Sequence, residues 1–135
     1  MAIQLSTPVR NAELDAVETA IGASPLLRIY SGAQPANCAA AASGTLLAEF
    51  PLPADFFAAA ANGVKSLSGT WQEDAAVAAG TAGHFRIYDN GDTACHMQGS
   101  AGETADAPNL VLQNKVIAVG QVITITQFNM TAGNA

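Results

Sequence analysis

Hydrophobic and polar positions follow different patterns before and after Pro25. The earlier stretch, "STPVRNAELDAVETAIG", spaces apolar residues about a helical turn apart, which predicts a helix over residues 8–21. Ser6 or Thr7 can cap this helix, Pro8 suits its first turn and Gly22 ends it. Its apolar stripe is thin, so the helix must rest on another part of the chain. The stripe consists of Val9, Ala16, Val17, Ala20 and Ile21.

After Pro25 the chain divides into short segments separated by Gly, Pro, Asn and Asp, which is typical of strands and turns. The segments are "LLRIYS", "TLLAEFPL", "VKSLSGTW", "GHFRIYD", "ACHMQGS", "NLVLQN" and "VITITQFNM". Several alternate; in "LLAEF", Leu46, Ala48 and Phe50 fall on one face, opposite Leu47 and Glu49. This pattern predicts one all-β domain over residues 1–135, a β-sandwich or barrel with one N-terminal helix.

Three other stretches are less regular. Residues 31–44 and 53–63 are predicted to be loops, and alanines in the second could form a helical turn. Residues 71–83 are predicted to be a weak strand with a flexible end or a surface arm. The last strand changes phase between Ile125 and Phe128, which predicts a β-bulge near Thr126 or Gln127.

The stretch "HFRIYDNGDTACHMQGS" predicts a hairpin, because Asp-Asn-Gly favours a turn. A five-residue loop at 89–93 sets Ile87 opposite Cys95 and Arg86 opposite His96. The same register completes the two faces of the hairpin. One face is then apolar, with Phe85, Ile87, Cys95 and Met97, and the other is polar, with His84, Arg86, Tyr88, His96 and Gln98. We expect the apolar face to be buried together with Leu27, Ile29, Ile123 and Ile125.

The same stretch gathers residue types that bind metals or carry out acid–base chemistry, namely His84, Asp89, Asp92, Cys95 and His96. Cys95 and His96 are adjacent on a strand and point to opposite faces, so one zinc ion cannot take both. The two aspartates suit a turn better than a calcium loop. We predict no metal, cofactor or catalytic residue, and expect Cys38 and Cys95 to be free thiols.

Composition narrows the possible functions. Charged residues make up 12% of the chain, and the net charge is −6 with five scattered cations, which argues against direct nucleic-acid binding. The sequence shows no signal peptide, no apolar run long enough to cross a bilayer, and no GxSxG, Walker or GxGxxG motif. We therefore expect a soluble, non-enzymatic protein made in the cytoplasm, whose neutral surface suits contact with neighbouring proteins.

One internal similarity links two of the predicted strands. "LRIYSGAQPANC" at 27–38 resembles "FRIYDNGDTAC" at 85–95: both run Arg, Ile, Tyr, then a turn and a cysteine. Two copies do not predict a repeat architecture. They indicate two strands in similar surroundings.

Three longer stretches resemble small virion proteins of tailed bacteriophages: "AIQLSTPVRNAELDAVETAIGASPLLRIYSG", "GTAGHFRIYD" with "CHMQGS", and "ITITQFNMTAGNA". Proteins of this size in such phages include jelly-roll capsid cement, or decoration, proteins. The resemblance therefore implies that the all-β fold is a jelly-roll-like antiparallel β-sandwich with one N-terminal helix. The resemblance implies a protein on the capsid exterior that binds the major capsid protein, clamps neighbouring subunits and forms a dimer or trimer.

Two other functions stay open. One is a different virion role, in the neck, tail or fibre base. The other is a non-catalytic carbohydrate-binding module, which would display exposed aromatic side chains. As contact elements for a virion role we expect the helix, the loops at 36–44 and 57–62, the 71–83 arm and the C-terminal "TAGNA".

Overall fold

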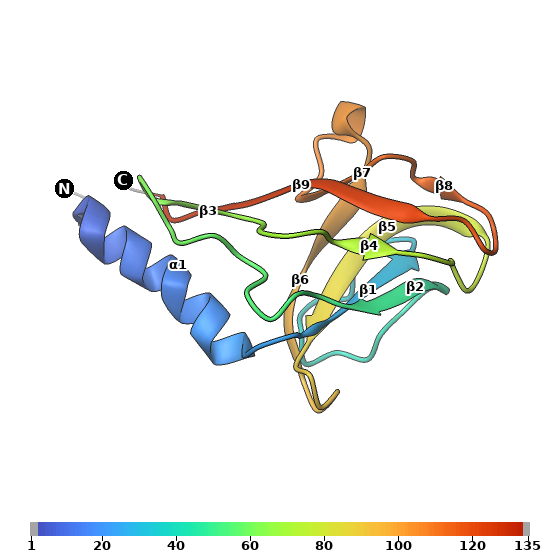
Figure 1. Cartoon of the computed structure of the whole chain (residues 1–135), viewed down its shortest axis with the longest axis horizontal. Coiled ribbons are helices and arrows are strands. Elements are labelled where there is room, and N and C mark those ends of the chain that lie inside the picture. The colour runs from blue at the N-terminus through green and yellow to red at the C-terminus, as the bar shows by residue number, and fades with distance from the viewer. Residues whose placement is uncertain (1–2, 134–135) are drawn as a thin grey trace.

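The fold is mainly β with one α-helix, in a computed structural model that describes residues 3–133 (Figure 1). Helix α1 spans Thr7–Ile21, which confirms the predicted helix. Pro8 lies in its first turn, and Gly22 ends it with a φ of 86° and an N–H that donates to the Glu18 carbonyl at 3.0 Å.

Nine strands form one mixed sheet in the order β2-β1-β5-β6-β7-β9-β3, with β4 paired to β9 and β8 paired to β5. Their bounds are β1 Leu26–Ser31, β2 Leu46–Pro51, β3 Val64–Ser66, β4 Gln72–Glu73, β5 Gly80–Tyr88, β6 Cys95–Gly102, β7 Leu110–Leu112, β8 Val116–Ile117 and β9 Ile123–Thr131. One pair, β6 with β7, is parallel, so the expected wholly antiparallel arrangement is wrong there. The connection between them contains a short 3₁₀ turn, Thr104–Asp106, and Ala107 in the left-handed conformation.

Aromatic rings form the centre of the core. Phe85 on β5 and Phe128 on β9 meet edge to face with ring centroids 5.5 Å apart, although two strands separate them in the sheet order. The sheet therefore curves until the inner faces of β5 and β9 touch. Trp71 and Phe57 add to this cluster, each with its ring centroid 5.6 Å from that of Phe128. Leu27, Ile29, Ile87, Ile123 and Ile125 are buried around them, as expected.

Aromatic side chains anchor two of the irregular stretches to the core. Residues 53–63 form no helical turn; Phe56 and Phe57 are buried and hold this loop against the core. Residues 71–83 contain the two-residue strand β4, which agrees with the predicted weak strand, and they are not a surface arm. Trp71 is 1% exposed, Ala76 is buried, and the segment continues directly into β5.

Bulges decide which side chains share a face. On β9, Val111 pairs with Gln127 and Leu112 with Ile125, so Thr126 is the extra residue and the predicted bulge is confirmed. In β2 a similar shift buries Leu47, so the simple alternation expected for "LLAEF" is wrong.

The predicted hairpin register is also wrong. Ile87 lies opposite Met97 and Tyr88 opposite Cys95, which leaves His96 as an extra residue on β6. Cys95 is thereby turned away from Ile87 and onto the face of Arg86 and Tyr88. Cys95 is half-buried at that face and does not enter the apolar core. Met97 does pack against the core, but it is only half-buried there.

Helix α1 lies to one side of the sheet body, beside β3 and the end of β9 (Figure 1). Only Leu14 and Ile21 of the helix are buried, while Val9 is 46% exposed, so the predicted apolar stripe is only partly correct. Val17 is partly buried against the core, and the other contacts are polar. We call them the polar seam: Arg10, Asn11, Asp15 and Glu18 of α1 against Ala58, Ala60, Gly63, Lys65 and Ala132.

Candidate functional site

The acidic residues of the stretch at 84–100 shape a turn. The Asp89 carboxylate accepts hydrogen bonds from the Thr93 N–H at 2.6 Å and from the Thr93 hydroxyl. These bonds hold the pKa of Asp89 below its ordinary value. Asp92 has a φ of 55° and pairs with Arg28 at 2.8 Å. His96 lies 3.6 Å from Asp89 and not beside Arg86, because the bulge carries it to the outside.

His84 and Arg86 do lie on the predicted polar face, but they are not at the surface. Each is no more than 1% exposed, because the loop between β1 and β2 covers them. We call this loop, residues 32–45, the roof loop. Its carbonyl oxygens face the sheet: Gly32 lies 2.9 Å from His84 Nδ1, and Pro35 accepts from Gln98 Nε2 at 2.7 Å.

Gly83 is required for the roof loop to approach so closely. A Cβ at this position would lie 2.1 Å from the Gly32 carbonyl oxygen. Any residue other than glycine would therefore clash with the backbone of the roof loop. Two further polar atoms, His84 Nε2 and Gln98 Oε1, are buried beneath the roof loop without a hydrogen-bond partner among residues 3–133. The enclosed layer is thus polar, in contrast to the aromatic core on the other side of β5.

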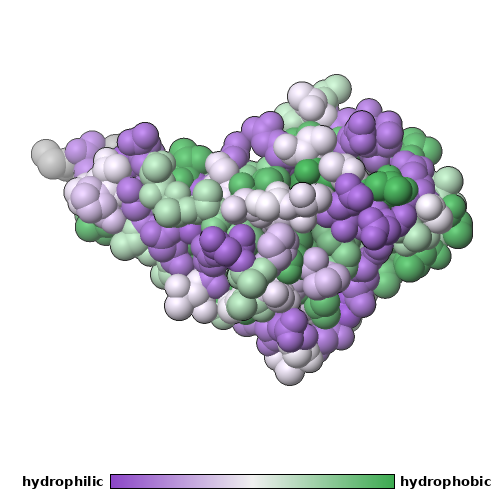
Figure 2. All heavy atoms as spheres, viewed as in Figure 1, coloured by the Kyte–Doolittle hydropathy of each residue, from purple (hydrophilic) through white to green (hydrophobic). Residues whose placement is uncertain are grey.

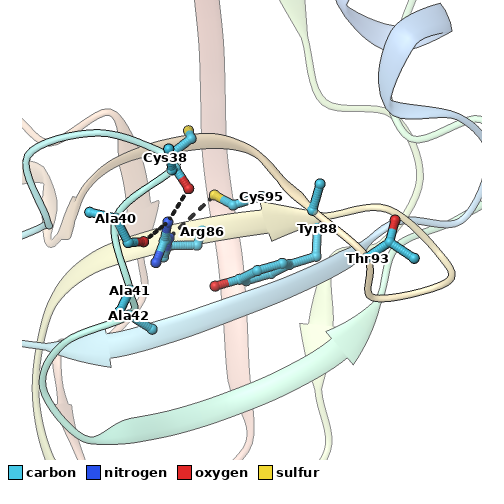
Figure 3. Close-up of a pocket in the computed structure, with 10 residues that line it drawn as sticks. Cys38, Ala40, Ala41, Ala42, Arg86, Tyr88, Thr93 and Cys95 are labelled. Carbon is cyan, nitrogen blue, oxygen red and sulfur yellow. Dashed lines mark hydrogen bonds between the residues drawn. The ribbon is translucent and has the colours of Figure 1, made fainter.

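Arg86 joins the roof loop to the sheet (Figure 3). Its Nη2 donates to the carbonyl oxygens of Cys38 at 2.7 Å and Ala40 at 2.9 Å, and its Nε donates to Cys95 Sγ at 3.2 Å. No carboxylate pairs with Arg86 among the described residues. Burial lowers the pKa of Arg86, but contact with Cys95 and nearby groups raises it by more.

The two arginines of the internal sequence similarity face each other across β1 and β5, with Arg28 directly opposite Arg86. Like charges in this position repel one another unless each is compensated. Arg28 pairs with Glu49 and Asp92 and lies 4.3 Å from the Tyr88 ring centre. The repeated "RIY" pattern therefore marks neighbouring strands, and only one of its two arginines is covered by the roof loop.

Tyr30 is buried beside this layer and stacks on His84, with ring centroids 5.1 Å apart. Burial, followed by contact with Tyr88, raises the pKa of Tyr30 to about 12. The hydroxyl is protonated at neutral pH.

A cavity of about 610 Å³ opens between the roof loop and the β5–β6 turn. It is lined by Cys38, Ala39, Ala40, Ala41, Ala42, Arg86, Tyr88, Thr93, Ala94 and Cys95. Figure 3 shows the two cysteines coming from opposite sides, Cys38 from the roof loop and Cys95 from β6. Alanine methyl groups form much of the wall, and the polar groups are the Arg86 guanidinium, the two thiols and the side chains of Tyr88 and Thr93.

No group of three or more His, Cys, Asp or Glu side chains could hold a metal ion anywhere in residues 3–133. The residues that the sequence suggested for a metal are separated: Cys95 lines the cavity, His96 on β6 lies beside Asp89 of the turn, and His84 is in the buried layer. Within the same part of the chain, no helix is long and apolar enough to cross a membrane.

The opposite end of the molecule from α1 carries a different feature. Four valines there are strongly exposed, at 52–68% of their surface, and we call them the valine cap. They are Val77, Val116, Val119 and Val122. Backbone bonds from Ala76 to Gln121 and from Gly120 to Ala76, at 2.9 and 2.8 Å, hold their segments together. Figure 2 shows apolar residues gathered at this end, beyond β8.

Sequence reasoning placed Val77 in a contact element but missed the other three valines. Their spacing in "VIAVGQV", with valines at 116, 119 and 122, was the available signal. The alanines of the roof loop are exposed on their outer side, as a contact element would be. Residues 58–62 of the second alanine-rich loop instead meet α1 at the polar seam, and Asn134 and Ala135 of the C-terminal "TAGNA" lie outside the described residues.

Comparisons with known protein families, with curated proteins and with solved structures find no match to this chain.

Proposed function

We propose that this chain is a structural protein of a tailed-bacteriophage virion. In the proposed role it is a cement protein that binds the outside of the head and joins neighbouring major capsid subunits. The observation that carries the proposal is the valine cap, four exposed apolar side chains in segments joined by backbone hydrogen bonds. Apolar groups left in water favour contact with a partner surface.

Three further features support a binding role. The chain has few charges, so a contact surface loses little solvation energy when it is covered. Three stretches of the sequence resemble small virion proteins of tailed phages. The curved mixed sheet is compatible with a jelly-roll-like sandwich, which we propose as the finer description of the fold.

We further propose that the protein acts as a dimer or trimer on the capsid exterior, without nucleic acid, membrane or catalysis. Many weak contacts repeated over one capsid add up to a large stabilisation. A neck, tail or fibre-base position would use the same apolar end against a different partner, so it remains the second candidate.

The carbohydrate-binding alternative loses its main support. All five phenylalanines and Trp71 are buried, so they form no exposed stacking platform. Tyr88 is half-buried and lies against Arg28.

The test uses phage heads assembled without this chain, to which purified protein is added back. Wild-type protein should sediment with the heads and increase DNA retention on heating. The double variant Val119→Ser, Val122→Ser should bind much more weakly. Val9→Ser is the matched control, since Val9 is an exposed valine on α1. Apolar binding should also change little with added salt.

Two outcomes would contradict parts of the proposal. Heads that neither bind the wild-type chain nor gain heat resistance rule out the cement role and favour the neck or tail. Heads that bind the valine-cap variant as well as the wild type show that another surface makes the contact.

A further inference from the structure

The two cysteines lie far apart in the sequence but meet at one guanidinium. Cys38 is in the roof loop and Cys95 begins β6, and both line the cavity beside Arg86 (Figure 3). Arg86 Nη2 is 2.7 Å from the Cys38 carbonyl oxygen, and Arg86 Nε is 3.2 Å from Cys95 Sγ. One rigid planar group therefore sets the position of both residues.

Both cysteines line the same cavity, so their side chains share one enclosed space. Burial raises the pKa of Cys38, and its contact with the Cys95 thiol raises it further. Cys38 consequently holds less thiolate at neutral pH than an exposed cysteine does. Cys38 therefore reacts second in the proposed sequence, after Cys95, whose Sγ lies beside the Arg86 guanidinium.

We propose that Cys38 and Cys95 are a redox-sensitive pair that forms a reversible disulfide, closing the roof loop onto β6. The oxidant is a small-molecule disulfide of the glutathione class, which reaches Cys95 through the open cavity. The bond would join the roof loop to β6, close to the point where Arg86 already connects the two segments.

The reaction balances as two thiol–disulfide exchanges. The Cys95 thiolate attacks one sulfur of oxidised glutathione, the glutathione S–S bond breaks, and one glutathione thiolate leaves. The Cys38 thiolate then attacks the Cys95 sulfur of the mixed disulfide and releases the second glutathione thiolate. The two leaving thiolates take up the two protons lost by the cysteines. Two protein thiols are oxidised and one glutathione disulfide is reduced.

The bond matters for the roof loop because little else holds it. Its alanines are largely exposed, and its contacts with the sheet are hydrogen bonds to carbonyl oxygens. A cross-link here also closes a long loop of chain, which restricts the unfolded state. Oxidation should therefore stabilise the folded protein and rigidify the cavity wall. The inference does not depend on the proposed virion role.

The experiment treats the reduced full-length chain with oxidised glutathione and then blocks remaining thiols with an alkylating reagent. Intact mass and peptide mapping should show an internal Cys38–Cys95 bond, a mass lower by two hydrogens and no retained glutathione. The melting midpoint should rise by several degrees and return to its starting value with dithiothreitol. Cys38→Ser should instead accumulate the mixed disulfide on Cys95.

A matched control moves the second thiol within the roof loop. The double variant Cys38→Ser, Ser43→Cys keeps two thiols, and its internal cross-link should form about tenfold more slowly if position matters. A wild-type chain that keeps two glutathione groups, or that cross-links only between molecules, overturns the proposal. Equal rates in the control variant would overturn the claim that Arg86 positions the pair.

Discussion

The sheet body and the helical end are held together by different interactions. In the body, Trp71, Phe57, Phe85 and Phe128 pack ring against ring with almost no exposure. At the helical end, α1 buries only Leu14 and Ile21, packs Val17 partly against the core and relies otherwise on the polar seam. Water can replace polar contacts at little cost, but it cannot replace buried apolar contacts. The helical end should therefore be the less stable region.

Lys65 is the centre of the polar seam. Its side chain is 1% exposed, and its Nζ lies 2.6 Å from Asp15 Oδ1, 2.9 Å from Glu18 Oε2 and 3.0 Å from the Ala58 carbonyl oxygen. Burial alone would lower the pKa of Lys65, but the two carboxylates raise it. The lysine is thus charged and fully partnered beneath the helix.

The largest expected effect is in the body. Trp71→Ala removes the ring that joins Phe56, Phe57 and Phe128, and its indole N–H bonds to Phe56 and Ser68. We expect the free energy of unfolding to fall by about 3–5 kcal/mol, as for other large buried side chains. Urea unfolding measures this. Val77→Ala, at an exposed site, should change it by less than about 0.5 kcal/mol.

The next effect is at the polar seam. Lys65→Ala leaves Asp15 and Glu18 without their cation, and should reduce the free energy of unfolding by about 1–3 kcal/mol. Lys115→Ala is the matched control, because its pair with Asp106 is at the surface and should contribute less than about 1 kcal/mol. Equal losses in the two variants would show that burial of Lys65 is unimportant.

A smaller effect is expected where the backbone is tight. Gly63 has a φ of 73°, and a Cβ there would lie 2.5 Å from Arg10 Nη1. Gly63→Ala should cost about 1–2 kcal/mol and loosen α1. Gly120→Ala is the control, since Gly120 has a φ of 79° but nothing within 4 Å of the added Cβ. Thermal or urea unfolding measures both variants. If Gly63→Ala loses more stability than Gly120→Ala, the difference reports the crowding at the polar seam.

The smallest effect concerns pH. The Lys65 ammonium, followed by the Ala60 N–H, holds the pKa of Asp15 below its ordinary value. The ionised Asp15 carboxylate therefore stabilises the fold at pH values above its ordinary, unfolded-state pKa. This stabilisation is lost as the pH falls through the lowered pKa of the folded state. Asp15→Asn should show a flatter fall of stability on acidification than wild type. Asn11→Ala, which removes an uncharged partner from the polar seam, should lower the stability without changing the shape of the pH curve.

Local patterns predicted the elements well. The helix ends were readable from Pro8 and Gly22, and the Thr126 bulge from the phase change between Ile125 and Phe128. These features depend on neighbouring residues alone. The bulge at His96 could not be predicted, because the apolar and polar residues around it show no change of phase. That bulge moved Cys95 to the other face of the sheet.

Contacts between distant segments were less predictable. Arg86 looked like a surface residue because its partners are backbone carbonyls, which no residue type reveals. The aromatic anchors Trp71 and Phe57 lie in irregular stretches where periodicity carries no information. The polar face of the hairpin was predicted correctly for His84 and Arg86, but its burial under the roof loop depends on the path of the backbone.

Amide hydrogen exchange of the native protein tests the difference between the two regions most directly. Amides of α1 should exchange through an opening of lower free energy than those of β5 and β9. Lys65→Ala should speed exchange in α1 and leave β5 nearly unchanged. If α1 and β5 exchange with the same free energy, and the variant shifts both equally, the protein unfolds as one unit and the account of a weaker, polar helical end is wrong.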